Sequence, residues 1–268
     1  MTEVSIITGA AGLLGEQHAL ALASEGYNLL LTDIEKKKLF KIQTKIKRKF
    51  KKNKIFVFPM DITNEDEIIE MKKFVKKKKL KITVLVNNAA MNPKMDNFTG
   101  ATLTGTIENY PVGLLKKEID VNLISAFLMI KHFGQLMSKN KKGSIINIGS
   151  DLSINAPDQS VYSKSDKITD VKNFKPIGYS ITKFGIIGLT KYVATYWAHK
   201  NVRCNALVPG AVKNNQPKYL SKNVSKRIPL GRWAKKDEYR KGLVFLAKDD
   251  SSYMTGQLLI IDGGRTAW

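Results

Sequence analysis

The chain alternates short apolar runs with longer segments in which apolar residues recur at helical spacing. The apolar runs are residues 4–8, 28–32, 54–58, 82–87, 143–150, 202–208 and 257–261. The helical patterns are residues 13–25, 34–50, 64–79, 111–138 with a break near Asp120, 177–199 and about 235–247. Continuous apolar strands separated by helices are typical of a parallel sheet covered on both faces. We therefore predict an α/β fold, a doubly wound (Rossmann) parallel sheet of about seven strands.

Three irregular segments, 90–110, 151–176 and 210–234, follow the fourth, fifth and sixth predicted strands. In a doubly wound sheet the carboxyl ends of the strands carry the ligand site. Because the sequence shows neither a repeat nor a long linker, we predict one dinucleotide-binding catalytic domain, residues 1–268. Segments 151–176 and 210–234 are expected to lie over its active site.

The first predicted strand runs into TGAAGLLG, which places Gly9, Gly12 and Gly15 between a strand and a helix. Such a turn lets the backbone approach a pyrophosphate, and the following helix offers free N–H groups. We expect Leu14, within the same turn, to join the three glycines in binding a cofactor.

The second predicted strand ends at Asp33, 24 residues after Gly9. A carboxylate there binds the ribose hydroxyls of the adenosine and repels a 2′-phosphate, which predicts NAD in preference to NADP. The run Lys36–Lys38 is the feature that favours NADP, because it could neutralise that phosphate. The next two strands end in Asp61 and Ile62, an expected adenine contact, and in NNAA, which contains Asn88 and Ala89.

Two tyrosines in SVYSKSDKITDVKNFKPIGYSITK are each followed by a lysine. Tyr179 and Lys183 stand four residues apart in a helical pattern, and therefore on one helix face. Tyr162 and Lys164 lie in a segment that reads as a loop. A phenol with a pKa of about 10 is a poor base at neutral pH, and a lysine cation one turn away stabilises the phenolate. We predict that Tyr179 is the acid–base group, with its pKa lowered by Lys183.

The ordered motifs TGAAGLLG, NNAA, DVNLISAF, YSITK and VPGAV, with the closing QLLIIDGG, resemble the short-chain dehydrogenase/reductase family in its single-domain branch. The resemblance covers essentially the whole chain. It implies that Lys183 also holds the nicotinamide ribose, that Ser150 binds the substrate oxygen, and that Asn122 holds a water in a proton relay. Many relatives place a threonine after the Pro-Gly; its absence leaves the backbone of Val212 and its neighbour to contact the nicotinamide amide.

The segment between Ser150 and Tyr179 is 28 residues, longer than is usual in the family. Its start, SDLSINAPDQSVY, resembles oxidoreductases of flagellin modification and nonulosonic-acid sugar biosynthesis. That resemblance implies a sugar-like substrate, an amino sugar with a phosphate or a nucleotide. Asp151, Tyr162 and Arg227 are the candidate substrate contacts, Arg227 for the phosphate. The alternative is a loop that only serves contacts between subunits.

Composition excludes several other classes. The chain has one cysteine among 268 residues, so no intramolecular disulfide forms, and no apolar run is long enough to span a membrane. The three histidines form no metal-ligand pair, and we predict no metal site. The chain start lacks a signal-peptide pattern, and we expect a cytoplasmic protein.

The formal net charge of +22 has two interpretations, a polyanion partner or solvated lysine-rich helix faces. The lysines cluster at 36–38, 45–54 and 72–79, within or at the ends of predicted outer helices. Arginine is scarce there and aromatic residues are few, whereas nucleic-acid surfaces rely on both. We therefore expect neither nucleic acid nor a membrane as a partner.

These patterns predict an oxidoreductase that transfers hydride between NAD and a secondary alcohol or ketone of a sugar-like substrate. Two alternatives stay open: an NAD-dependent sugar epimerase, because TGAAGLLG also fits the TGxxGxxG spacing of that branch, and a non-catalytic dinucleotide-binding regulator. The closing segment QLLIIDGGRTAW resembles a tail that often lies at a subunit interface, so we expect a homo-oligomer, a dimer or a tetramer.

Overall fold

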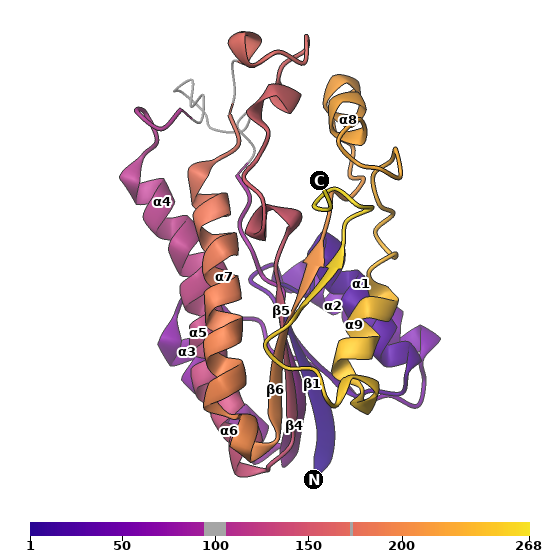
Figure 1. Ribbon diagram of the computed structural model, residues 1–268. Coiled ribbons are helices and arrows are strands. Elements are labelled where there is room, and N and C mark those ends of the chain that lie inside the picture. The colour runs from indigo at the N-terminus through magenta and orange to yellow at the C-terminus, as the bar shows by residue number, and fades with distance from the viewer. Residues whose placement is uncertain (94–105, 172–173) are drawn as a thin grey trace.

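A computed structural model describes residues 1–93, 106–171 and 174–268 of the chain. Residues 94–105 of the predicted 90–110 loop, and residues 172–173 of the 151–176 segment, lie outside the described residues. The strands are β1 Thr2–Thr8, β2 Leu29–Thr32, β3 Ile55–Val57, β4 Leu80–Asn87, β5 Gly143–Ile148, β6 Val202–Pro209 and β7 Leu258–Ile261. They form one seven-stranded sheet in the order β3-β2-β1-β4-β5-β6-β7, with every neighbouring pair parallel (Figure 1). The predicted doubly wound parallel sheet is thus confirmed.

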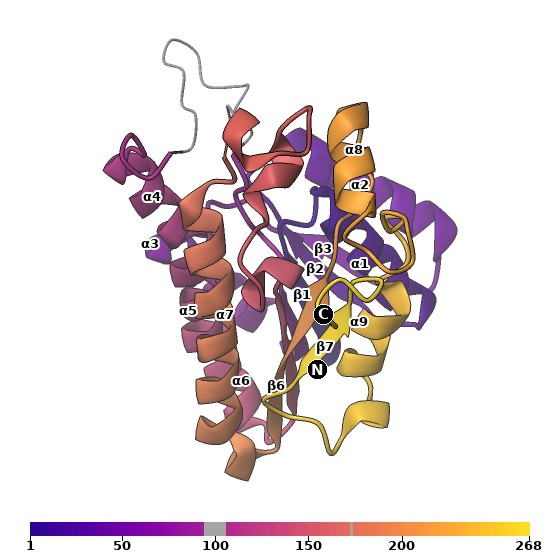
Figure 2. The ribbon, with the colours of Figure 1, turned by 45° about the horizontal axis from the view of Figure 1, so that its top comes forward.

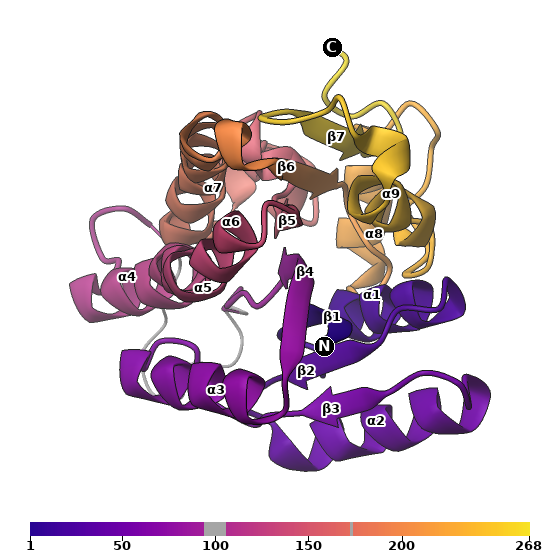
Figure 3. The same ribbon diagram turned by 90° about the horizontal axis from the view of Figure 1, so that it is seen from below.

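Helices cover both faces of this sheet (Figure 3). They are α1 Leu13–Ser24, α2 Lys36–Lys49, α3 Glu65–Lys77, α4 Val112–Ile119, α5 Ser125–Met129, α6 Gln135–Lys139, α7 Ile177–Tyr196, α8 Lys218–Ser225 and α9 Arg240–Ala247. One core layer joins the sheet to α1, α2 and α9, and the other joins it to α3, α5 and α7. Because each central strand is buried on both faces, its side chains are mostly apolar on both faces; the buried polar exceptions include Ser5, Asn147 and Asn205.

Strands β1 and β4 are neighbours near the centre of the sheet. Successive strands are added on one side of β1 as far as β3 and on the other side of β4 as far as β7, so the strand order reverses between β1 and β4. The connections that leave the carboxyl ends of these two strands therefore diverge and open a crevice between them. The glycine turn after β1 and the NNAA segment after β4 both start at this crevice. The fold thus brings the two predicted cofactor motifs to one place.

The structure differs from the predicted elements in two places that concern the site. The segment 210–234 contains a helix, α8, which its lysine- and asparagine-rich sequence did not predict. The expected break near Asp120 is a π-helical turn, Asp120–Ile124, so the backbone stays helical from α4 into α5. Turns of this kind are frequent at functional sites. Among the described residues, no helix is both long enough and apolar enough to cross a membrane.

His18 on α1 is fully buried, and neither ring nitrogen makes a hydrogen bond of good geometry. Burial lowers its pKa from 6.5 to about 4, and the Asn88 amide nearby only partly opposes this shift. At a pH between about 4 and 6.5, His18 is therefore protonated in the unfolded chain but neutral in the folded protein. The free energy of unfolding decreases as the pH falls from 6.5 toward 4.

We predict that His18→Leu removes this acid sensitivity. The shift of pKa corresponds to about 3 kcal/mol of unfolding free energy at pH 4. Urea unfolding at pH 7 and pH 4 measures it, with the exposed His199→Gln as control. An equally steep acid loss in His18→Leu and in the unchanged protein would contradict this account.

Candidate active site

One cavity of about 1070 Å³ lies at the carboxyl ends of the strands. It is lined by residues that follow six successive strands, β1 to β6, and by the C-terminal tail. The predicted residues in its wall are Gly9, Gly12, Leu14, Asp33, Asp61, Ile62, Asn88, Ala89, Ser150, Asp151, Tyr162, Tyr179, Lys183 and Val212. Gly15, Asn122 and Arg227 are not in its wall.

The glycine turn leaves no room for side chains where it contacts its surroundings. Gly9 has a φ of +60°, and a Cβ there would lie 2.6 Å from the Cα of Ala89. A Cβ on Gly15 would lie 2.1 Å from the carbonyl oxygen of Gly9, so Gly15 supports the turn from beneath. Gly12 caps α1 without any side-chain hydrogen bond, which leaves the first N–H groups of the helix available to an anion. The turn therefore fits a dinucleotide pyrophosphate.

Two carboxylates, those of Asp33 and Asp61, lie in the part of the cavity wall that follows strands β2 and β3. Asp33 accepts hydrogen bonds from the backbone N–H of Ala11 at 2.8 Å and of Glu35 at 2.9 Å. Asp33 is thus tied to the glycine turn itself. Asp61 accepts from the backbone N–H and the hydroxyl of Thr63. Both side chains are fixed, and both line the cavity.

Tyr179 and Lys183 stand one turn apart near the start of α7, as their spacing predicts. Lys183 Nζ lies 5.6 Å from the centre of the Tyr179 ring and donates a hydrogen bond of 2.7 Å to the carbonyl oxygen of Ile148. Only 4% of Lys183 is exposed. Burial lowers its pKa to about 8, with a further contribution from the charge of Lys175. The lysine is thus held against the end of β5, beside the phenol.

The expectation that the pKa of Tyr179 is lowered is wrong for the protein alone. Burial raises that pKa to about 12, although the Ser150 hydroxyl opposes the shift; the charge of Asp151 adds to it. Desolvation of the phenolate outweighs the opposing hydrogen bond with Ser150. The phenol is therefore neutral and ready to donate a proton at neutral pH.

Ser150 starts a chain of polar contacts that ends on the C-terminal tail. Its hydroxyl donates to Asp151 Oδ1 at 2.8 Å, and Asp151 Oδ2 accepts from Arg265 Nη1 at 2.7 Å. Both members of this ion pair are largely buried, with side-chain exposures of 15% for Arg265 and 6% for Asp151. The serine is therefore positioned from two directions, by its own turn and by the tail.

Asn122 lies in the π-helical turn beneath the cavity and is almost fully buried. Its amide oxygen accepts from the backbone N–H of Met91 at 2.6 Å, while Nδ2 donates to the Met91 carbonyl and to the Thr182 hydroxyl. The side chain is thus committed to fixing the segment after β4 against α7. Any water that Asn122 holds would have to bind its backbone, not its amide.

The segment 158–167 packs against α8, next to the cavity (Figures 1 and 2). Val161 joins a small core with Val224 and Ile228, and Tyr162 packs against it. The Asn223 side chain donates to the carbonyl oxygens of Val161 and Ser163. Tyr162 reaches the cavity wall from this support, and burial raises its pKa, so its phenol stays neutral.

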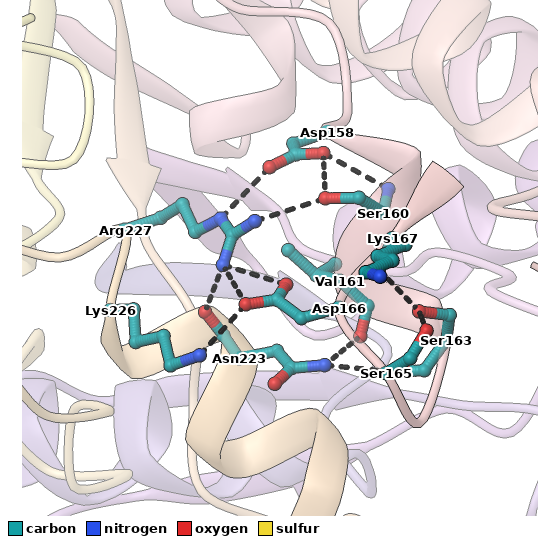
Figure 4. Close-up of polar contacts among 10 residues, drawn as sticks. All are labelled: Asp158, Ser160, Val161, Ser163, Ser165, Asp166, Lys167, Asn223, Lys226 and Arg227. Atoms are coloured by element: carbon teal, nitrogen blue, oxygen red, sulfur yellow. Dashed lines mark hydrogen bonds and ion pairs between the residues drawn. The ribbon is translucent and has the colours of Figure 1, made fainter. Parts of the chain in front are cut away.

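Arg227 does not face the cavity, which corrects its assignment as a phosphate contact. Its guanidinium donates to Asp158 Oδ2 at 2.8 Å, to Asp166 Oδ2 at 2.9 Å and to the Ser160 hydroxyl at 2.9 Å (Figure 4). Arg227, with Lys226, lowers the pKa of Asp166. Two carboxylates already neutralise the arginine, so it serves as a latch that joins α8 to segment 158–167.

We predict that Arg227→Met opens this latch. Amide hydrogen exchange in segment 158–167 is expected to rise at least about tenfold, because charge-assisted hydrogen bonds contribute roughly 1.5–3 kcal/mol each. Arg232→Met is the control, since Arg232 pairs with the exposed Glu238 outside the latch. Unchanged exchange in 158–167 would contradict the role assigned to Arg227.

Three cationic residues of the cavity wall were missed by the sequence reasoning: Lys117, Lys175 and Arg265. Lys175 ends the long segment before α7, and Arg265 follows the closing Asp-Gly-Gly. No local pattern marked either residue, because only the fold brings the tail back over the sheet edge. In the described part of the chain, no group of three or more His, Cys, Asp or Glu side chains is arranged to hold a metal ion.

Comparison with known proteins agrees with this geometry. A family described as enoyl-(acyl carrier protein) reductase matches residues 9–266. The 3-oxoacyl-[acyl-carrier-protein] reductase of Thermotoga maritima is 32% identical over 98% of this chain and 97% of its own. The chain belongs to the short-chain dehydrogenase/reductase family. It is thus an NAD(P)-dependent oxidoreductase by family.

The names of other similar proteins specify different cofactors and substrates. An NAD-dependent glycerol dehydrogenase of Listeria innocua is 27% identical over 98% of this chain and 94% of its own. A gluconate 5-dehydrogenase of Burkholderia cenocepacia, solved with NADP and tartrate, superposes with a TM-score of 0.84 at 23% identity, covering 99% of this chain and 96% of its own. These relatives do not single out the flagellin-modification branch.

Proposed function

We propose that this protein is an NAD-preferring dehydrogenase or reductase of a secondary alcohol or ketone in a phosphorylated or nucleotide-linked amino sugar. The observation that carries the proposal is the meeting of Ser150, Tyr179 and Lys183 in the wall of one cavity that also contains the glycine turn. A neutral phenol, a hydroxyl held by Asp151 and a buried ammonium are the groups that a reversible carbonyl reduction needs.

In our proposal Tyr179 is the catalytic acid and base. During reduction the phenol donates its proton to the carbonyl oxygen, and during oxidation the phenolate removes the proton of the hydroxyl. The Ser150 hydroxyl, which donates to Asp151 in the protein alone, turns its O–H to the same substrate oxygen and orients it. Lys183 favours the phenolate by its charge and binds the ribose next to the nicotinamide. The cofactor, when bound, supplies or accepts the hydride at the carbon.

The cofactor site is assigned to the glycine turn, Asp33 and Asp61. Gly9, Gly12 and Gly15 allow the pyrophosphate to approach α1, and Asp33 binds the adenosine ribose. Ile62, Asn88 and Ala89 line the adenine and ribose end in this assignment, Leu14 lies beside the pyrophosphate, and the backbone of Val212 contacts the nicotinamide amide. The fixed charge of Asp33 supports NAD, since a 2′-phosphate beside it would meet like charge.

The polar character of the long segment before Tyr179 supports a sugar-like substrate. It places Asp151 and Tyr162 in the wall beside Ser150, where both can bind hydroxyl groups. The amino-sugar class is supported only by the likeness of SDLSINAPDQSVY to that branch.

A homo-oligomer is supported by exposed apolar side chains on two neighbouring helices. Phe127 of α5 and Phe184 of α7 are 47% and 46% exposed, and Ile124, Ile181, Tyr192 and Tyr196 are exposed with them. Such a face is typical of a contact between subunits. Light scattering of the purified protein tests it, and a monomer would contradict it.

Turnover on a substrate panel tests the proposed function. The panel contains phosphorylated and nucleotide-linked amino sugars, a simple polyol and a 3-oxoacyl thioester, each assayed with NAD(H) and with NADP(H). We expect net NADH formation or consumption on an amino sugar. Sole activity on the thioester would contradict the substrate class, and sugar conversion without net NADH would indicate an epimerase.

A further inference from the structure

We propose that Lys175 and Arg265 form an anion-binding site at the substrate end of the cavity, which holds a phosphate or carboxylate group of the substrate. This inference rests on the proposed function and specifies its substrate as one that carries an anionic group close to the reacting carbon. It also moves the expected phosphate contact away from Arg227.

Lys175 is held over the catalytic tyrosine. Its Nζ lies 4.1 Å from the centre of the Tyr179 ring and donates a hydrogen bond of 2.7 Å to Asn92 Oδ1. An ammonium group has three donors, and the amide oxygen of Asn92 takes only one without neutralising the charge. The lysine therefore keeps spare donors at the cavity wall.

Arg265 lines the same cavity as the catalytic pair. It pairs with Asp151, the carboxylate that also accepts the Ser150 hydroxyl. A guanidinium has five N–H donors, and within the described residues Asp151 is the one acceptor that it contacts. The remaining donors can bind a second anion beside the first.

The tail that carries Arg265 is built to a fixed shape. Asp262 accepts hydrogen bonds from the backbone N–H groups of Gly264 and Thr266 and from the Thr266 hydroxyl. Gly264 has a φ of +91°, and a Cβ there would lie 2.8 Å from Pro229. The tail turn thus packs tightly on the segment after α8 (Figure 1). A turn held in this way presents Arg265 at a defined position.

The charge balance at this end of the cavity is positive. Away from Asp33 and Asp61, the wall contains four cations and two carboxylates: Lys117, Lys175, Lys183, Arg265, Asp120 and Asp151. Arg265 pairs with Asp151. Burial lowers the pKa of Lys175 to about 8; the charges of Asp151 and Glu118 oppose this shift, and the nearby charge of Arg265 adds to it. Two cations that repel each other in a half-buried wall are stabilised when an anionic ligand binds between them.

The phosphate contact proposed from the sequence, Arg227, does not compete for this role. Arg227 is neutralised by Asp158 and Asp166, and it lies outside the cavity wall. Lys213 and Lys218 in the segment 210–234 also lie outside that wall. The substrate oxygen between Ser150 and Tyr179 would have Lys175 on one side and Arg265 on the other. An anionic group within a few bonds of the reacting carbon can therefore contact both.

Binding of inorganic phosphate to the enzyme saturated with NADH tests the proposal, because the cofactor then occupies the pyrophosphate site. We compare Lys175→Met and Arg265→Met with Arg265→Lys, which keeps the charge, and with Lys164→Met, an exposed lysine of the same segment. Titration calorimetry is expected to show about ten- to hundredfold weaker phosphate binding in the two charge-removing variants, an intermediate loss in Arg265→Lys, and no change in Lys164→Met.

Steady-state kinetics identify the preferred anionic group and distinguish a failure of the anion site from a failure of the proposed reaction. kcat/KM is measured for a neutral sugar, its phosphate and the matching sugar acid, and the anionic form with the larger loss in the variants is the preferred ligand. The double variant Asp151→Asn with Arg265→Met removes both partners of the ion pair and controls for misfolding by its thermal unfolding. Unchanged phosphate affinity in both single variants, or equal losses for neutral and anionic sugars, would overturn the proposal. If the variants lose phosphate binding but no sugar is turned over, the anion site stands and the proposed reaction fails.

Discussion

Tyr179→Phe is expected to lower kcat by at least about 100-fold in both directions, the low end of the contribution of a general acid–base group. The phenylalanine ring keeps the packing of α7 and the contact with Lys175 but lacks the proton that reaches the substrate oxygen. Steady-state kinetics on any substrate found in the panel measures this effect, and fluorescence titration of NADH checks that cofactor binding is retained.

The matched control is Tyr162→Phe. Tyr162 lines the same cavity, but it stands on the segment latched to α8, away from Lys183. We expect it to raise KM and leave kcat within about tenfold, an effect of the size of one hydrogen bond to the substrate. If Tyr179→Phe retained its activity and Tyr162→Phe lost it, the catalytic role would belong to Tyr162.

The pKa of Tyr179 sets the direction of the pH dependence. Because burial raises that pKa to about 12, the proton donor for reduction is present throughout the neutral range. The base for oxidation is scarce there, and the oxidation rate is therefore expected to rise with pH. In Tyr179→Phe this rise should disappear from the residual activity.

Asp33→Ser is expected to change the cofactor preference by about 100-fold or more, because the substitution removes a fixed negative charge from the place where a 2′-phosphate would lie. The unchanged enzyme should use NAD better than NADP. The variant should gain activity with NADP and lose activity with NAD, since the hydrogen bonds to the ribose hydroxyls are lost. The ratio of kcat/KM for the two cofactors measures the change.

Asp61→Asn is the control for this comparison. It keeps the hydrogen bonds to Thr63 and alters a charge that we assign to the adenine end, so its cofactor ratio should stay near that of the unchanged enzyme. If the unchanged enzyme preferred NADP, the role of Asp33 would be contradicted. Lys36–Lys38 would then be the residues expected to neutralise the 2′-phosphate.

The sequence predicts the fold well because the fold depends on local patterns. Short apolar runs such as residues 82–86 are typical of strands that are buried on both faces, and helical periodicity lies between them. Tyr179 and Lys183 are predictable for the same reason, since a spacing of four fixes one helix face. The helix α8 escaped prediction because its few apolar residues pack into a small local core with segment 158–167 and residues of segment 210–234, and not on the sheet.

The parts of the site that the sequence did not predict depend on contacts between distant residues. Arg265 meets Asp151 across 114 residues of sequence, through a tail turn whose position is set by the segment after α8. Arg227 could be read as a phosphate contact because nothing local shows that Asp158 and Asp166 neutralise it. The raised pKa of Tyr179 likewise follows from burial, which spacing alone does not reveal.

The most direct test of the central claim is the transfer of deuterium from NADH labelled at the reactive position of the nicotinamide to a keto sugar of the panel. We predict that mass spectrometry finds one deuterium on the carbinol carbon of the product, and that Tyr179→Phe slows its appearance by at least about 100-fold. A product that carries no deuterium, or labelling at the same rate in Tyr179→Phe, would contradict hydride transfer assisted by Tyr179.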